Sequence, residues 1–288
     1  MLIGAHLSTE GGLPTAFDRA RDEGCEAFQI FTKNKGAWAA RPLTQDEIKE
    51  FRDKASVKPR KPVVAHAAYL INIASPSRVL QRKSTAALRV ELERCEALGI
   101  DGLVLHPGSH LGTSEDEGLK RVQTALDEVH RATRGFRTKI LLENSAGQGS
   151  SVCVALASIG KLLRSVKTPE RLGVCIDTCH LFAAGYDLRS RETYDAVMEE
   201  LEREIGSERV LCIHLNDSKR ELGSRIDRHE HLGRGLLGLE GIRRILTDRR
   251  FARTPFIFEL PPENGMIRKN LAVLRRLAKP ARPRGGKR

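Results

Sequence analysis

Nine side chains with nitrogen or oxygen donors mark this chain as a candidate for metal-dependent chemistry. They are five histidines and four carboxylates: His66, His106, Glu143, Asp177, His180, His214, Asp227, His229 and Glu259. Imidazole combined with carboxylate suits Zn, Mn or Fe better than Ca or Mg, whose sites prefer oxygen alone. Nine donors exceed what one tetrahedral ion needs, but they suit three ions if one carboxylate bridges two of them. Four carboxylates gathered without cations would repel one another, whereas divalent ions would stabilise their ionised forms.

Each donor taken singly has a simpler explanation. A histidine at the end of a strand is more often a hydrogen-bonded core residue than a ligand, and an aspartate there usually caps the next helix. The number of donors changes this balance, because packing does not explain why one apolar strand after another stops at a metal-capable side chain. Cys175 and Cys179 have a spacing that matches no common zinc pair, so we interpret them as residues of the core or behind the ligands.

The hydrophobic pattern predicts how these donors are brought together. Val-, Ile- and Leu-rich runs, typical of strands buried on both faces of a parallel sheet, occupy residues 2–6, 27–31, 62–66, 102–106, 139–143, 172–177, 209–214 and 255–259. Amphipathic stretches typical of helices occupy residues 13–23, 44–55, 77–98, 114–134, 152–165, 193–205, 239–247 and 264–277. Thr44 and Glu47 form the pattern of a capping box at one helix start. Eight strands alternating with eight helices indicate the α/β class and a single (β/α)8 TIM barrel.

The predicted strands end at intervals of 25 to 45 residues, which is the spacing of βα units, and all of them except the second, which ends on Phe31, end on a polar side chain. Strands three to eight end on His66, His106, Glu143, Asp177, His214 and Glu259. We expect His180 in the turn that follows Asp177, and Asp227 and His229 in a Gly-rich loop. The C-terminal strand ends of a barrel meet at one mouth, where active sites are built, so the nine donors are predicted to converge there.

Length and composition narrow the class of protein. The chain has 288 residues, with 49 Lys and Arg against 37 Asp and Glu, a net charge of +12, and six cysteines. No apolar run approaches the roughly 18 residues of a membrane span, and no signal peptide is visible. The cysteines suit reduced core thiols, so we expect a cytoplasmic protein that contacts no membrane. We place one domain at residues 1–278 and a basic, disordered, Pro- and Gly-rich tail at 279–288.

The positive charge and the metal cluster together point to phosphate chemistry. A basic balance favours a polyanionic partner, although it says nothing of the fold. Two metal ions about 4 Å apart can hold a water-derived nucleophile for in-line attack, while another stabilises the leaving oxygen. We therefore expect the protein to carry out chemistry on a phosphate group.

The segments that carry the donors closely resemble endonuclease IV, the family of zinc-dependent nucleases that repair apurinic/apyrimidinic sites in DNA. The matching motifs are AHAAYLIN at 65–72, LHPGS at 105–109, LEN at 142–144, GQG at 147–149, DTCH at 177–180, HLNDS at 214–218 and DRH at 227–229. The resemblance runs from residue 4 to residue 261 and so covers nearly everything except the tail.

This resemblance implies a ligand set and a reaction. The first of three zinc ions would be held by His66, His106 and Glu143. Glu143 would bridge to a second ion, whose other ligands would be Asp177, His214 and Glu259. The third ion would be held by His180, Asp227 and His229. Mn²⁺ is an alternative at one or more positions. The implied reaction is hydrolysis of the phosphodiester 5′ to an abasic site in duplex DNA, leaving a 3′-hydroxyl and a 5′-deoxyribose phosphate, with trimming of blocked 3′ ends as a related activity. Glu259 would accept a proton, Glu143 would take part through the bridge, and the enzyme would act as a monomer.

The resemblance also implies contacts with DNA. Tyr69 matches the residue that inserts into the base stack, and Asn72 in the same loop is placed to contact the backbone. Gly36 departs from the family, since some relatives carry an arginine there that enters the gap in the duplex. Lys35 can replace the charge of that arginine but not its planar stacking. We interpret Trp38 as an anchor of this loop rather than a DNA contact.

Two other functions remain open on sequence grounds. The strongest rival is a sugar isomerase or epimerase with one metal ion on a related barrel, for which Glu143, Asp177, His214 and Glu259 would suffice. The remaining five donors would then have no role, which favours the nuclease. The second rival is a non-catalytic binder of damaged DNA on a decayed barrel, and an intact ligand set argues against decay.

Overall fold

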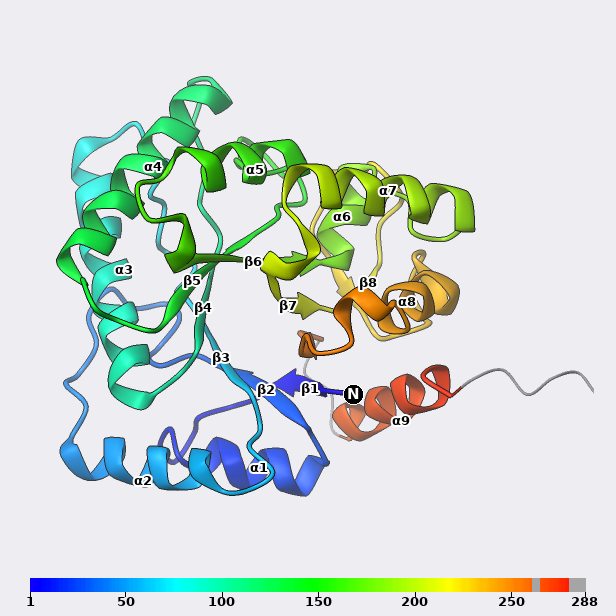
Figure 1. Ribbon diagram of the computed structural model, residues 1–288, viewed down its shortest axis with the longest axis horizontal. Helices are drawn as coiled ribbons and strands as arrows, with labels where there is room; N and C mark the ends of the chain where they lie inside the picture. The colour runs from blue at the N-terminus through cyan, green and yellow to red at the C-terminus, as the bar shows by residue number, and fades with distance from the viewer. Residues whose placement is uncertain (261–264, 280–288) are drawn as a thin grey trace, which may run out of the picture.

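Eight parallel strands close into a barrel in the computed structural model, which describes residues 1–260 and 265–279. Around the barrel the order is β1-β10-β7-β6-β5-β4-β3-β2 (Figure 1). The strands are β1 (Ile3–His6), β2 (Ala27–Ile30), β3 (Val63–His66), β4 (Gly102–Leu105), β5 (Lys139–Glu143), β6 (Leu172–Asp177), β7 (Val210–His214) and β10 (Phe256–Phe258). The predicted (β/α)8 barrel is confirmed. The neighbouring strands β1 and β2 approach closely at Gly4, where a Cβ atom would lie only 1.6 Å from the carbonyl oxygen of Ala27.

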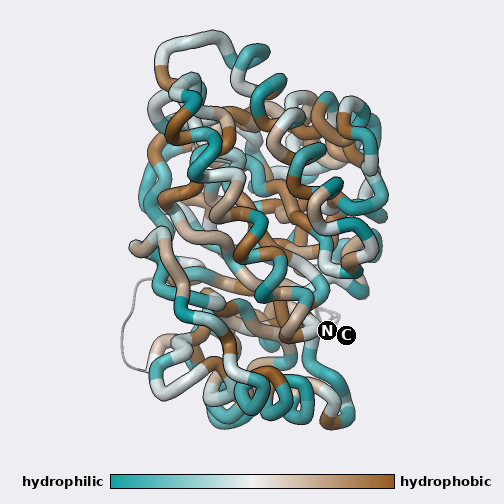
Figure 2. The backbone as a smooth tube through the Cα atoms, turned by 90° about the vertical axis from the view of Figure 1, so that its left-hand side faces the viewer, coloured by the Kyte–Doolittle hydropathy of each residue, from teal (hydrophilic) through white to brown (hydrophobic). Residues whose placement is uncertain are grey.

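Helices surround the barrel on its outside (Figure 1). They are α1 (Thr15–Glu23), α2 (Gln45–Ser56), α3 (Arg78–Leu98), α4 (Glu115–Ala132), α5 (Leu156–Ser165), α6 (Thr178–Ala184), α7 (Arg191–Glu204), α8 (Gly238–Leu246) and α9 (Met266–Leu277), with single 3₁₀ turns at Pro169–Arg171, Ser207–Arg209 and Arg249–Phe251. Hydrophilic and hydrophobic residues alternate along the helices (Figure 2), as expected where one face packs on the strands and the other meets water. The capping box is confirmed, because the Thr44 side chain accepts from the Glu47 amide and the Glu47 carboxylate accepts from the Thr44 amide.

The core has two layers, one inside the barrel and one between strands and helices. The inner layer consists of Val64, Val104, Leu141, Cys175, Cys212 and Ile257. All six cysteines are buried and unpaired, as expected for reduced thiols. Inside the barrel this apolar layer forms a floor, and the polar strand ends lie at the C-terminal mouth.

The structure corrects three details of the sequence prediction. The residues after Asp177 form helix α6, so His180 lies on a helix and not in a turn. Helix α5 begins at Leu156 rather than at residue 152, because Cys153 has a left-handed backbone with a φ of 62°. A short antiparallel ribbon, β8 (Asp217–Ser218) with β9 (His229–Glu230), was not predicted.

The C-terminal end of the barrel domain lies beside its beginning. Helix α9 packs against strand β1 (Figure 1). The predicted start of this last helix, residue 264, and the predicted tail beyond residue 279 lie outside the described residues. In the part of the chain that the structure describes, no helix is both long and apolar enough to cross a membrane.

Candidate metal centre

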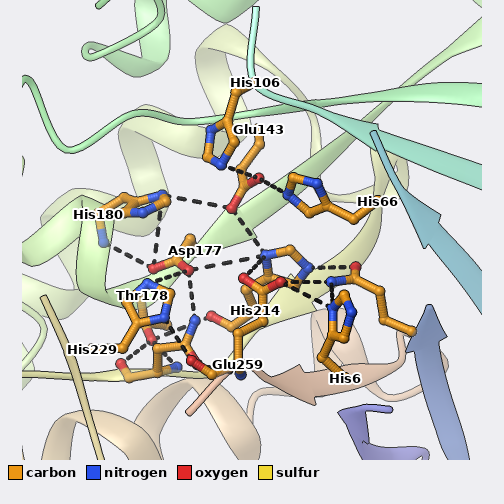
Figure 3. A network of polar contacts seen from close by, with 12 residues as sticks. His6, His66, His106, Glu143, Asp177, Thr178, His180, His214, His229 and Glu259 are labelled. Carbon is orange, nitrogen blue, oxygen red and sulfur yellow. Dashed lines mark hydrogen bonds and ion pairs between the residues drawn. The ribbon is translucent and has the colours of Figure 1, made fainter. Parts of the chain in front are cut away.

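The nine candidate donors gather at the C-terminal mouth of the barrel (Figure 3). Strands β3, β5, β6 and β7 end on four of them, which are His66, Glu143, Asp177 and His214. Two more directly follow strands β4 and β10, namely His106 and Glu259. The other three are supplied by helix α6 and by the segment at β9, and they are His180, Asp227 and His229. Parallel strands of one barrel therefore deliver donors that are far apart in the sequence to one small volume.

The donors form three groups within which the candidate ligand atoms lie no more than 4.8 Å apart. The first group is His66, His106 and Glu143; the second group is Glu143, Asp177, His214 and Glu259; the third group is His180, Asp227 and His229. Glu143 belongs to two groups, so these two are contiguous. Each group contains imidazole together with carboxylate, the donor combination that zinc accepts.

Glu143 has the geometry that a bridging carboxylate needs. Its Oε2 lies 3.3 Å from His66 Nε2 and 3.2 Å from His106 Nε2. Its Oε1 lies 2.9 Å from His214 Nδ1. Oε2 thus faces the two imidazoles of the first group, and Oε1 faces the imidazole of the second group. The side chain is fully buried, so this orientation is fixed by its neighbours.

The histidines are oriented as metal-binding histidines usually are. In His66, His180 and His229 the Nδ1 atom lies 2.7–2.9 Å from a backbone carbonyl oxygen, to which it can donate. That bond places the proton on Nδ1 and leaves the Nε2 lone pair free for a ligand bond. Nε2 of His229 is buried without a hydrogen-bond partner, although it lies 3.2 Å from the Asp227 carboxylate. A cation between these atoms would satisfy both, so the residues fit a bound metal.

The buried carboxylates at the mouth of the barrel favour positive charge on the groups beside them. Burial lowers the pKa of His180, but the Asp177 charge and the hydrogen bond to Asp227 outweigh it and raise the pKa to about 10. Burial likewise lowers the pKa of His229, and Asp177 and Asp227 raise it to about 9. Burial raises the pKa of Glu143, yet the neighbouring imidazoles hold it well below its usual range. The carboxylates thus favour positive charge on the neighbouring imidazoles, and bound metal ions would supply the same compensation.

Asp177 has both of the roles considered from the sequence. Its Oδ1 accepts from the His180 amide at 2.8 Å and so caps helix α6. Its Oδ2 accepts from Asn216 Nδ2 at 2.7 Å and lies 3.9 Å from His214 Nδ1. Asn144 holds the backbone of Asp177 through its amide N–H and its carbonyl. The capping oxygen fixes the side chain, and the other oxygen lies between the second and third groups, 3.5 Å from His229 Nε2.

Three comparisons with known proteins place the chain in a family. A family model described as xylose isomerase-like TIM barrel matches residues 17–277. The chain is 45% identical over 279 residues to probable endonuclease 4 of Chloroflexus aggregans, covering 96% of this chain and 98% of that protein. It is 42% identical over 277 residues to probable endonuclease 4 of Trichlorobacter lovleyi, covering 96% and 99%. The crystal structure of endonuclease IV from Thermus thermophilus superposes with a TM-score of 0.87 at 36% identity, covering 96% and 98%.

The chain belongs to the endonuclease IV family. It also shares the barrel with sugar-converting proteins, such as a D-tagatose 3-epimerase-like protein with a TM-score of 0.72 at 18% identity over 96% and 97% of the two chains. That likeness shows the fold alone. The family membership agrees with the resemblance found in the motifs.

The residues predicted to contact DNA surround the metal centre of this endonuclease IV family member. Tyr69 is 58% exposed and lines an open cleft of about 620 Å³ together with His106, His180 and Glu259. The Nζ atom of Lys35 lies 5.6 Å from the centre of the Tyr69 ring, which is within cation–π range. The structure thus places these two side chains together at the edge of the cleft.

Asn72 and Trp38 have structural contacts of their own. The Asn72 amide accepts from the Ser109 backbone N–H at 2.9 Å and donates to the Ser109 carbonyl at 3.0 Å, and it also lines the cleft. Trp38 packs against the hydrophobic core, and Lys83 Nζ lies 4.3 Å from its ring centre. Asn72 therefore ties two loops of the mouth together, and Trp38 is placed as the loop anchor that we expected.

Sequence reasoning missed several polar residues that hold the donors. Asn144, Asn216 and Asp217 are fully buried beside the mouth, and so is Gln29 on strand β2. Asn144, Asn216 and Asp217 lie within the LEN and HLNDS motifs, whereas the signal for Gln29 was that a polar residue interrupts the apolar run between Phe28 and Ile30.

Asp217 holds the loop that supplies part of the third group. Its carboxylate accepts from five backbone N–H groups at 2.8–3.1 Å, those of Ser218, Gly233, Gly235, Leu237 and Gly238. Gly235 must be glycine here, because a Cβ atom would lie 2.4 Å from the Asp217 carboxylate. The loop between β8 and α8 includes Asp227 and His229, so its shape decides where these two donors lie.

We expect Asp217→Asn to destabilise the protein by about 2–4 kcal/mol, because an amide nitrogen would face N–H groups and leave them unsatisfied. The midpoint of thermal unfolding should fall by about 4–16 °C. The zinc content should fall by one ion per chain as the third group loosens. Asp53→Asn is the control, since that carboxylate is exposed on α2. Unchanged stability and zinc content in the Asp217 variant would contradict this role.

Proposed function

We propose that the protein is a DNA repair endonuclease that hydrolyses the phosphodiester 5′ to apurinic/apyrimidinic sites in duplex DNA. The products would be a 3′-hydroxyl and a 5′-deoxyribose phosphate, and blocked 3′ ends would be trimmed at the same site. One observation carries the proposal: all nine donors of the family pattern are present and form three groups at one mouth. The relatives named probable endonuclease 4 support the reaction class. All nine donors come from one chain, so a monomer suffices.

In this proposal each group holds one zinc ion, with Mn²⁺ as an alternative at one or more positions. The first and second groups share Glu143, whose two oxygens face different imidazoles. Zinc ions bound there would lower the pKa of water towards about 7 and polarise the phosphoryl oxygens of the substrate. The chain's own contribution is to fix the donors and to move a proton.

Glu259 is the residue of the second group best placed to accept that proton. Its side chain is 14% exposed and lines the cleft, whereas His214 and Glu143 are fully buried. Neighbouring imidazoles keep its pKa low despite burial, so the carboxylate is ionised. Glu143, enclosed by imidazoles on both oxygens, acts by holding the first two groups together.

Selection of damaged DNA follows from the cost of extruding a nucleotide. An abasic nucleotide has no base, so moving it out of the helix forfeits little stacking and pairing, whereas an intact nucleotide costs a few kcal/mol more. The exposed Tyr69 ring at the edge of the cleft can fill the space left in the stack. Lys35 above this ring adds positive charge towards the phosphates. Gly36 has no side chain that could enter the duplex, so filling the gap on this side of the duplex depends on the Tyr69 ring.

The rival function on this fold is a sugar isomerase or epimerase with one metal ion. The second group alone resembles such a site. The first and third groups add five donors that this chemistry does not need, which favours the nuclease. Three bound metal ions per chain would support the nuclease, and one would support the isomerase.

The decisive experiment uses an end-labelled duplex with one tetrahydrofuran abasic analogue. The zinc-loaded protein should make a single nick directly 5′ to the analogue, leaving a 3′-hydroxyl that a DNA polymerase extends without further treatment. The same duplex with an intact nucleotide at that position is the control and should stay uncut. Cleavage of both duplexes alike, or of neither, would contradict the proposal.

A further inference from the structure

Gln29 is a buried polar residue in the middle of the apolar strand β2, and its side chain reaches the second group. Its Nε2 lies 2.6 Å from Glu259 Oε1 and 2.9 Å from His6 Nδ1. Its Oε1 lies 2.8 Å from His214 Nε2. Gln29 is fully buried, so these three contacts replace the hydrogen bonds that water would have made. The Gln29 amide thus joins strand β1, strand β7 and the end of β10, which supply His6, His214 and Glu259. Figure 3 shows these three side chains close together.

The donors and acceptors in this contact set have only one consistent arrangement. An ionised Glu259 carboxylate can only accept, so the amide nitrogen of Gln29 must face it. The amide oxygen then faces His214, and His214 Nε2 must carry the proton that it donates to Gln29. With one proton fixed on Nε2, the Nδ1 atom of His214 is the one that faces Glu143 and Glu259, at 2.9 Å and 3.2 Å from carboxylate oxygens, so it is the atom that would bind a cation shared with them.

His6 completes the arrangement from strand β1. The second N–H of the Gln29 amide is directed at His6 Nδ1, which accepts it in the neutral ring. The His6 ring packs on Phe31, with ring centres 4.5 Å apart. The Glu259 carboxylate keeps the Gln29 amide from turning over, since a flipped amide would place its oxygen against that carboxylate, and His6 accepts the remaining N–H of the amide.

We propose that Gln29, held by His6, is a positioning residue that fixes the tautomer of His214 and the orientation of Glu259 for metal binding in the second group. The inference rests on the proposed function only in taking this group as a metal site. Residues that donate to or accept from metal ligands fix the tautomer and rotation of the ligand, and their loss typically weakens metal binding about 10–100-fold. The hydrogen bonds of the Gln29 side chain reach only one of the three donor groups, so the effect is local.

The alternative is that Gln29 only fills space in the core. The Gln29→Met variant distinguishes this packing role from the positioning role. Methionine has a similar length and volume but neither donates nor accepts in a comparable way, so packing is kept and the three hydrogen bonds are lost. Gln81→Met is the matched control, because Gln81 on α3 is half-buried and donates to the Arg121 carbonyl away from the mouth.

The primary measurement is zinc retained per chain during titration with a competing chelator. We expect Gln29→Met to release one ion at about 10–100-fold lower chelator concentration than the wild type, while the other ions and the Gln81→Met protein behave as the wild type. The second measurement is nitrogen NMR of the zinc-loaded protein labelled at histidine. His214 should show a protonated Nε2 and a ligated Nδ1 in the wild type, and a faster-exchanging Nε2 proton in Gln29→Met.

Neither zinc retention nor the His214 signal depends on nuclease activity. Failure of the positioning role can therefore be distinguished from failure of the proposed function. Wild-type chelator release and an unchanged His214 signal in Gln29→Met would overturn the positioning role while the proposed function stands. Zinc binding with the expected His214 tautomer but no cleavage of the abasic duplex would overturn the proposed function and leave the positioning role supported. A wild type in which His214 is not ligated at all would overturn the inference.

Discussion

Glu259→Gln should lower the rate of nicking at an abasic site by about 100–10,000-fold while DNA affinity changes only a few-fold. The amide has nearly the same shape as the carboxylate, but it carries no charge and cannot take a proton from water. Glu259 is the only member of the second group with any exposed side-chain surface, 14%, so no other carboxylate of that group has equal access to the cleft. Affinity is spared because it depends mainly on contacts with phosphates along the duplex.

Single-turnover cleavage and equilibrium binding, measured on the same abasic duplex, separate the two effects. Glu199→Gln on the exposed face of α7 is the matched control and should behave as the wild type. Zinc analysis of the Glu259 variant belongs in the same experiment, because loss of activity with all ions retained identifies proton transfer rather than metal loss. Cleavage at a near wild-type rate would show that another group accepts the proton.

The barrel and the position of its donors could be predicted because two independent patterns coincide. Buried parallel strands appear in the sequence as continuous apolar runs, and these runs end at residues such as His66, Glu143 and Asp177. Barrel closure then brings the strand ends together whatever their separation in sequence. The sharing of Glu143 between two groups came from the family resemblance, and only the coordinates show that its two oxygens face different imidazoles.

The parts that could not be predicted depend on contacts between distant segments. Nothing near Gln29 in the sequence signals that it meets His214, which is 185 residues away. Of the five N–H groups around Asp217, those of Gly233, Gly235 and Leu237 belong to an irregular loop, which has no periodicity to detect. Helix α6 was overlooked because it is short and buried, so it lacks the alternation of polar and apolar residues that marks a surface helix.

Removing the metal should abolish cleavage of the abasic duplex and also make the folded protein less stable. The mouth packs Glu143, Asp177 and His214 with no exposed surface, and these groups need compensating charge that water cannot supply. An ion present at 100 times its dissociation constant stabilises the folded state by about 2.7 kcal/mol, so stripping should lower the unfolding midpoint by about 5–11 °C. Chelation followed by calorimetry and a nicking assay measures both effects.

Adding back different ions tests why the loss occurs. Zn²⁺ should restore both cleavage and thermal stability, because each group offers imidazole as well as carboxylate. Mg²⁺ and Ca²⁺ should restore neither, since these ions prefer sites made only of oxygen. Asp217→Asn provides an internal comparison, because a loosened third group should recover less stability on zinc addition than the wild type does. Full activity in protein from which transition metals have been removed to below detection would contradict a metal-dependent mechanism, whatever the arrangement of the nine donors.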